Sequence, residues 1–277
     1  MEISFLYSLP ILIDALIFFI VLLLALELGF RVGFARRDTW KDADSGGGAI
    51  VQTSMFALLG LILAFTYAAS VSRLDARKQA VLLESNALGT AFHRADLVAE
   101  PGRTELKRTL LDYARTRVFA PGALKRSEER WAAVNRTIKQ QKRLWPAAKQ
   151  VVKQDNPDPM EAALVAAINA VYDAHSVRFA AIIDTLPRIV MWMLLFVAAA
   201  SLSVAGFNAG IQGRMSRWRV TALTLVLTGL MTVIIDFDRP LDGMVIVDQQ
   251  TLNSVIAEME VDLHSLPDPP DSKLSVR

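Results

Sequence analysis

The clearest chemical pattern in the chain is a row of residues in one apolar stretch. Their spacing alternates between four and three residues, which places them along one side of an α-helix. The row runs from a polar residue through large apolar side chains and hydroxyls to two arginines: Gln52, Phe56, Leu59, Leu63, Thr66, Ser70, Arg73 and Arg77. We call this row the 52–77 seam.

The 52–77 seam has two interpretations. If several copies of its helix surrounded an axis, Phe56, Leu59 and Leu63 would form a pore gate that excludes water. Arg73 and Arg77 would then form basic rings that attract anions at the pore mouth. The same spacing is also typical of ordinary packing in a membrane helix bundle, followed by arginines that anchor the helix at the interface.

A second candidate site ends the last apolar stretch with the run Asp236-Phe237-Asp238-Arg239-Pro240. One interpretation is a structural helix stop, in which Asp236 pairs with an arginine such as Arg73 or Arg188. The alternative is an ion-binding box, because carboxylates at i and i+2 supply oxygen ligands that Ca²⁺ prefers, although two donors are too few alone.

Two acids fall inside the first apolar stretch, where charges are costly and often functional. Glu27 is followed one helical turn later by Arg31, which predicts an interfacial ion pair. Asp14 has no partner nearby in the sequence. It either reaches the headgroups or lines a water-filled cavity.

Polar residues are also frequent in the two long helical segments that flank the middle of the chain. We expect hydrogen bonds between helices among Glu84, His93, Asp173, His175 and Arg178. Neither histidine has a second histidine four residues away, so no metal site and no cofactor are predicted. The chain also lacks a phosphate-binding glycine loop, a nucleophile elbow and a dinucleotide fingerprint, so the sequence predicts no enzyme and no catalytic residue.

The elements that must position these residues are membrane helices. Of the 277 residues, 53% are hydrophobic and 21% charged, an apolar share larger than one soluble core of this size needs. Residues 49–72 and 189–207 carry no charge and, at about 1.5 Å per residue, can cross a hydrocarbon layer of roughly 30 Å. No Lys or Arg precedes Arg31, which argues against a cleaved signal peptide.

We therefore predict an all-α membrane protein with four transmembrane helices and a helical extramembrane domain between the second and third. Residues 1–73 form a hairpin with spans at about 10–30 and 49–72, and residues 74–186 form the helical domain. Residues 187–240 form a second hairpin with spans at about 188–208 and 219–236. Residues 241–277 contribute a short helix and a disordered tail.

Charge gives the expected partners and orientation. The net charge of +2 gives no support for nucleic-acid binding, and the expected partners are the lipid bilayer and small inorganic ions. Basic residues are dense in both short loops, which predicts that these loops are cytoplasmic. The helical domain and both termini would then lie on the outer, periplasmic side of the inner (plasma) membrane, although six basic residues on that side nearly balance the count.

Several motifs together resemble the bestrophin-like family of largely uncharacterised membrane proteins. They are the runs at 58–66, 73–77, 84–91 and 94–97, the group Asp173-Ala174-His175 with Arg178, Pro187, and the box at 236–240. The resemblance covers residues 49 to 260. It implies a distant relation to bestrophins, which are pentameric anion channels whose second transmembrane helix lines the pore, and whose termini and helical region are cytoplasmic.

Two classes of function remain open from the sequence. The first is a homo-oligomeric ion channel, anion-conducting by resemblance, with the second transmembrane helix lining the pore. The second is a non-conducting membrane scaffold or sensor whose helical domain binds a partner. A seam that faces an axis favours the channel, whereas a seam packed inside one subunit favours the scaffold.

Overall fold

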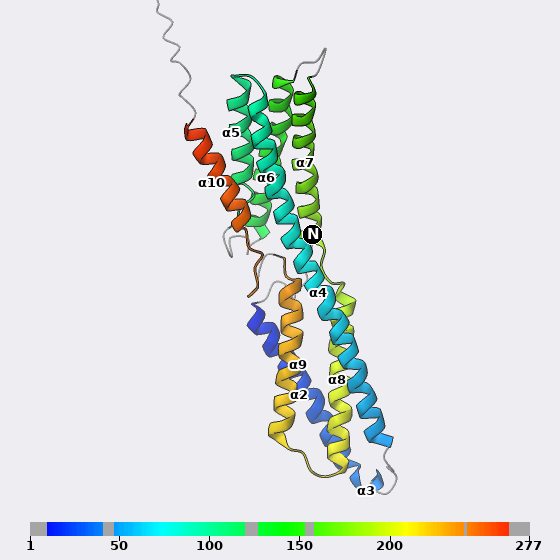
Figure 1. Ribbon diagram of the computed structural model, residues 1–277. Helices are drawn as coiled ribbons and strands as arrows, with labels where there is room; N and C mark the ends of the chain where they lie inside the picture. The colour runs from blue at the N-terminus through cyan, green and yellow to red at the C-terminus, as the bar shows by residue number, and fades with distance from the viewer. Residues whose placement is uncertain (1–9, 41–46, 120–126, 153–157, 241–242, 266–277) are drawn as a thin grey trace, which may run out of the picture. The chain divides into compact units, whose positions relative to one another are not determined.

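The protein is described by a computed structural model over residues 10–40, 47–119, 127–152, 158–240 and 243–265. Within these residues the regular elements are helices and none is a strand, which confirms the all-α prediction. The predicted disordered tail lies outside the described residues. Figure 1 shows the helices α2 (Ile11–Ala35), α3 (Arg37–Trp40), α4 (Gly47–Arg94), α5 (Gly102–Arg115), α6 (Ser127–Val151), α7 (Pro159–Ile183), α8 (Arg188–Ile211), α9 (Arg217–Asp238) and α10 (Gln250–Ser265), with a 3₁₀ turn, η1 (Ala95–Leu97).

Among the described residues, four helical segments are long and apolar enough to cross a membrane, and they contain α2, α4, α8 and α9. In the most apolar window of each segment only 11% to 44% of the residues are buried within the chain. Large side chains such as Phe65, Phe196 and Leu225 are more than half exposed. Apolar surface of this extent is costly in water but not in lipid, so the chain is an integral membrane protein.

The chain divides into two compact units. Unit 1 comprises residues 1–74 and 184–245, and unit 2 comprises residues 75–183 and 246–277. Helix α4 belongs to both, because its 48 residues run from one unit into the other without a break. This continuity agrees with the lack of any proline or turn cluster in its sequence.

Unit 1 is built around a very close contact between α2 and α8. A Cβ atom added at Gly29 would lie 2.1 Å from the backbone oxygen of Ser203, and one at Gly206 would lie 2.2 Å from that of Leu26. Two further glycines, Gly33 and Gly210, are equally tight. Each helix therefore supplies a pair of glycines four residues apart, the arrangement that lets membrane helices pack backbone against backbone.

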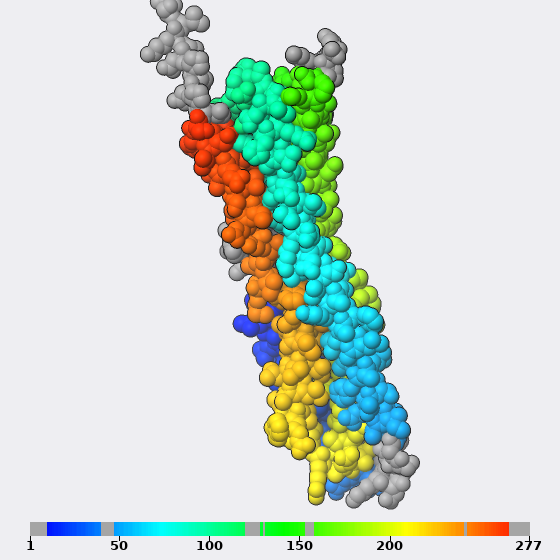
Figure 2. Space-filling view, in the orientation of Figure 1, coloured from blue at the N-terminus to red at the C-terminus, as the bar shows by residue number. Residues whose placement is uncertain are grey.

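Unit 2 is a helical bundle with its own core. Buried residues of α4, α5, α6, α7 and α10 share one apolar cluster, which includes Leu88, Leu110, Ile168 and Met259. Helix α10 packs against α5, as Figure 2 shows, and Lys107 of α5 lies fully buried between Asp262 (2.8 Å) and Asp96. Helix α10, predicted only as a short helix within residues 241–277, is thus part of the bundle.

Candidate functional site

Most of the 52–77 seam that lies in the apolar stretch of α4 is buried inside unit 1. Leu59 and Leu63 are 1% and 8% exposed and belong to the core cluster, and Phe56 packs against it. Thr66 and Ser70 are also buried. Leu59 and Leu63 therefore pack inside one chain, as the packing interpretation of the seam expects.

Polar contacts fix the seam against α8. The side-chain amide of Asn208 donates to the side-chain oxygen of Gln52 and to the backbone oxygen of Gly48, both at 2.9 Å. The hydroxyl of Ser201 donates to the backbone oxygen of Met55 at 3.4 Å. Gln52, expected at the polar end of a pore, therefore contributes to a helix contact within one chain.

The two arginines at the end of the seam are engaged as well. The Nε of Arg73 lies 3.3 Å from the Oδ2 of Asp184, and Arg73 is partly buried. Arg77 is 3% exposed and donates to the backbone oxygen of Ala181 at 3.1 Å. The Arg77 side chain is thus buried, whereas the Arg73 side chain remains 21% exposed.

The opposite side of α4 carries a second row with the same alternating spacing. Its members are exposed, with apolar side chains between two serines: Ser54, Leu58, Leu61, Phe65, Ala68 and Ser72. We call this the 54–72 row. Leu58, Leu61 and Phe65 are 50%, 53% and 69% exposed, so this face is available to lipid or to other copies of the chain. The sequence holds both rows, and only packing distinguishes them.

The box at residues 236–240 holds the end of unit 1 together. The carboxylate of Asp236 accepts backbone N–H groups of Met244 (2.6 Å) and Val245 (3.0 Å), in the loop that follows α9. The carboxylate of Asp238 accepts the backbone N–H of Leu186 on both oxygens at 2.9 Å, just before α8 begins. Asp236 was expected to pair with an arginine, but its carboxylate accepts hydrogen bonds from backbone N–H groups. Arg73 pairs with Asp184 instead.

Gly243 shows how tightly the loop folds over Asp236. Its φ of +150° is one that L side chains rarely adopt, and an added Cβ would lie 2.6 Å from the Oδ1 of Asp236. Because backbone N–H groups occupy the oxygens of both carboxylates, the box has the character of a structural clamp. Among the described residues no group of three histidine or acidic side chains is placed to hold a metal ion.

Asp14 has a partner that is 225 residues away in the sequence. Its carboxylate accepts a hydrogen bond from the guanidinium of Arg239, and both side chains are buried, at 1% and 4% exposure. The two interpretations left open for Asp14, headgroup contact and a wet cavity, are thus replaced by a buried ion pair between α2 and the end of α9. No local sequence pattern signals a contact of this separation.

Unit 2 contains a separate buried charge cluster centred on Glu84. Its carboxylate accepts hydrogen bonds from Arg117 Nε and Arg178 Nη1, both at 2.6 Å, and from the Tyr113 hydroxyl at 3.2 Å. The Tyr113 hydroxyl also lies 3.2 Å from Nδ1 of His175. The expected hydrogen bonding between the long helical segments thus includes Arg178 and Glu84, whereas Arg117 and Tyr113 were not anticipated.

The surroundings of Tyr113 in this cluster keep its hydroxyl protonated. Burial, together with the neighbouring Glu84 carboxylate, raises the pKa of Tyr113, so the phenol stays protonated and remains a donor. Gln249, next to α10, accepts a hydrogen bond from Arg178 Nη2 at 3.4 Å and exchanges hydrogen bonds of 2.8 and 3.1 Å with the backbone of Phe119. The cluster therefore joins α4, α5, α7 and the C-terminal segment.

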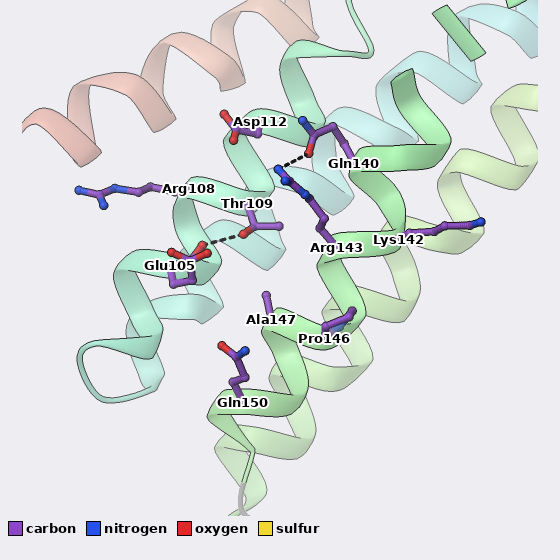
Figure 3. A pocket seen from close by; sticks show the side chains of 10 residues that line it. All are labelled: Glu105, Arg108, Thr109, Asp112, Gln140, Lys142, Arg143, Pro146, Ala147 and Gln150. Atoms are coloured by element: carbon purple, nitrogen blue, oxygen red, sulfur yellow. Dashed lines mark hydrogen bonds between the residues drawn. The ribbon is translucent and has the colours of Figure 1, made fainter. Parts of the chain in front are cut away.

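A shallow pocket in unit 2 lies between α5 and α6 (Figure 3). Its lining is mixed in charge, with Glu105 and Asp112 alongside Arg108, Lys142 and Arg143. The two hydrogen bonds drawn there join Thr109 to the backbone of Glu105 (2.8 Å) and Arg143 to Gln140 (3.4 Å). The positive and negative charges of these side chains nearly cancel, so the lining favours neither an anion nor a cation.

Comparisons with known proteins agree with this architecture. A bacterial Bestrophin homolog from Klebsiella pneumoniae matches with a TM-score of 0.62 and 12% identity, covering 90% of this chain and 99% of that chain. The structure of a membrane protein variant matches with a TM-score of 0.58 and 14% identity, covering 91% and 99%. At these identities the likeness shows the fold alone. A comparison with curated protein sequences finds no match.

Residues 18–252 match the sequence model of the family described as "Bestrophin-like domain". This range includes α4, α8, α9 and the part of α2 from residue 18 onward, together with the 52–77 seam, the Glu84 cluster and the box at 236–240. It confirms the resemblance drawn from the motifs. The chain belongs to the bestrophin-like family.

Proposed function

We propose that the chain is the subunit of a homo-oligomeric ion channel in which α4 lines the pore. The observation that carries the proposal is the 54–72 row, an exposed face of α4 with an apolar centre and a hydroxyl at each end. In a ring of subunits Leu58, Leu61 and Phe65 would form a constriction that ions cross only when it is wetted. The 52–77 seam would hold α4 against its own subunit.

The oligomer is part of the proposal because, among the residues that the structure describes, the membrane helices of one chain pack around an apolar core. Exposed apolar residues also occur in unit 2, where Leu83, Val177 and Phe179 are 46% to 51% exposed. These are suited to contact with neighbouring copies of the unit. Five copies and a preference for anions follow from the resemblance to bestrophins. The predicted arrangement, with residues 74–186 as a helical domain outside the membrane, belongs to the same proposal.

The test is a matched pair of variants in liposomes. Leu61→Ala with Phe65→Ala should raise anion flux well above wild type, because smaller side chains allow the constriction to be wetted. The control is Leu59→Ala with Leu63→Ala, which removes similar volume from the buried side of the same helix. The control should cost about 2–5 kcal/mol of stability per site and give no gain in flux.

The two variants separate the interpretations. A folded Leu61→Ala, Phe65→Ala protein with no more flux than wild type would reject the channel. A folded control with raised flux would indicate that the 52–77 seam, and not the 54–72 row, lines the pore.

The second candidate is a non-conducting membrane scaffold or sensor, and burial of the 52–77 seam inside one subunit favours it. In that case the 54–72 row would contact lipid or a partner helix, and both variants would leave flux unchanged. The partner would bind unit 2.

For orientation, we propose from the loop charges that α3 and the loop between α8 and α9 are cytoplasmic and that the predicted helical domain is periplasmic. A periplasm-dependent reporter fused after residue 277 should then be active, and a matching cytoplasm-dependent reporter silent. The reverse pattern would give the orientation that the resemblance to bestrophins implies.

A further inference from the structure

Unit 1 contains a crevice between α2 and α9 that is apolar along one part and ionic at its end. Leu23, Leu24 and Val220 line the apolar part, and Glu27, Arg31 and Arg217 line the ionic part. Leu24 is 56% exposed, so the crevice is open to the surroundings of the helices. Its ionic end lies near the last turns of α2 and the first turn of α9, where two membrane helices end.

The ionic end has an excess of positive charge. Glu27 bridges the two arginines, with Oε1 at 3.0 Å from Nε of Arg31 and Oε2 at 3.0 Å from Nη1 of Arg217. A guanidinium has five N–H donors, so one carboxylate shared by two of them leaves most donors available. The arginine side chains are 75% and 70% exposed, and one negative charge offsets only one of the two positive charges.

We propose that this crevice binds an acidic glycerophospholipid. The phosphate would lie between Arg31 and Arg217, since guanidiniums suit phosphate geometry, and an acyl chain would cover Leu23, Leu24 and Val220. Basic pockets between membrane helices are typical sites for anionic headgroups. A free phosphate would leave the apolar part uncovered, so the arrangement favours a lipid over a soluble anion. This inference does not depend on conduction.

Binding is measured by native mass spectrometry on the full chain in neutral detergent with added lipid. Phosphatidylglycerol should bind more tightly than phosphatidylcholine of the same acyl chains, and glycerol 3-phosphate should give no complex. Each arginine near a headgroup contributes an affinity factor of about fivefold, so Arg31→Gln with Arg217→Gln should weaken phosphatidylglycerol binding about 25-fold.

Two single variants sharpen the test. Glu27→Gln removes the competing carboxylate and should tighten phosphatidylglycerol binding about fivefold, which a merely structural role of the cluster would not do. Arg219→Gln is the matched control, because it makes the same charge change two residues along α9, about 200° around the helix and outside the crevice lining. It should leave binding unchanged.

Three lipid-binding results would overturn the proposal, as would one result with glycerol 3-phosphate. They are equal binding of the two lipids to wild type, unchanged binding in the double variant, and an Arg219→Gln loss of about fivefold, the factor expected for one arginine at the headgroup. The last result would mean that the arginines attract acidic lipid only through the general positive field of this end. Tight binding of glycerol 3-phosphate would show a soluble anion site in place of a lipid site.

Discussion

Burial makes Asp14 and Arg239 depend on each other. Removing a charged group from water costs several kcal/mol, and only a well-placed partner offsets this cost. The pair also joins the first membrane helix to the residue that follows the last one. Arg239 is thus held at a defined position beside Asp238, which accepts the backbone N–H of Leu186.

Arg239→Gln should therefore destabilise the protein by about 3–5 kcal/mol, because it leaves the Asp14 carboxylate buried without its cation. Thermal unfolding in detergent measures the effect. Adding Asp14→Asn should recover much of the loss, since the stranded charge is then removed. Arg37→Gln, which breaks the exposed pair with Asp38, is the control and should change little. Equal melting temperatures for all variants would contradict a structural role of the buried pair.

At the scale of single residues the sequence predicts only contacts that are close along the chain. The Glu27–Arg31 pair follows from helical spacing and is present, with Arg217 as an unexpected third member. The partners of Asp14, Asp236 and Glu84 are contributed by tertiary folding, so no spacing rule identifies them. The motif at 236–240 could be recognised from the sequence as a unit. That its carboxylates accept hydrogen bonds from backbone N–H groups could not be predicted.

Among the elements, α2 and α8 show how little side-chain volume a membrane contact needs. Between apolar helices in lipid there is no hydrophobic driving force, so close backbone packing and hydrogen bonds must supply the attraction. Gly29, Gly33, Gly206 and Gly210 allow this approach, and the hydroxyl of Ser203 donates to the backbone oxygen of Ala25 at 2.9 Å. The contact depends on the absence of four side chains.

Gly206→Ala should lower stability by about 1–3 kcal/mol, since its Cβ would meet backbone atoms of α2 that cannot rotate away. Gly229→Ala is the matched control in α9, because no atom lies within 4 Å of its added Cβ. The control should leave the melting temperature unchanged or slightly raised, because alanine favours the helix over glycine. If both variants melt alike, the close approach of α2 and α8 does not limit stability.

Most elements could be predicted because their signals are local. The long apolar stretches, the uninterrupted pattern through α4 and the proline that precedes α8 identify helices without knowledge of the fold. The face that each helix buries could not be predicted for α4, whose two rows share the same spacing and a similar apolar centre. The glycine pairs in α2 and α8 were a usable signal that sequence reasoning missed.

For the whole molecule, a pore lined by the 54–72 row requires an assembly larger than a dimer, because two copies of α4 cannot surround a passage. Native mass spectrometry in detergent should give a mass that is a multiple of the 30.5 kDa chain, with five chains expected from the family resemblance. A monomer or dimer under conditions that keep the protein folded would remove the basis for an axial pore. The scaffold would then be the better description.

The contact between α2 and α8 can form only late in biosynthesis, because its two helices are far apart in the sequence. Ala25 and Ser203 are 178 residues apart, so at about 5–20 residues per second the ribosome makes α8 roughly 10–35 s after α2. During this interval α2 must stay in the bilayer with its glycine surface unmatched. It can do so because its backbone groups are satisfied within the helix and lipid tolerates bare glycine. Helix α2 therefore remains in the membrane without its α8 partner for this interval.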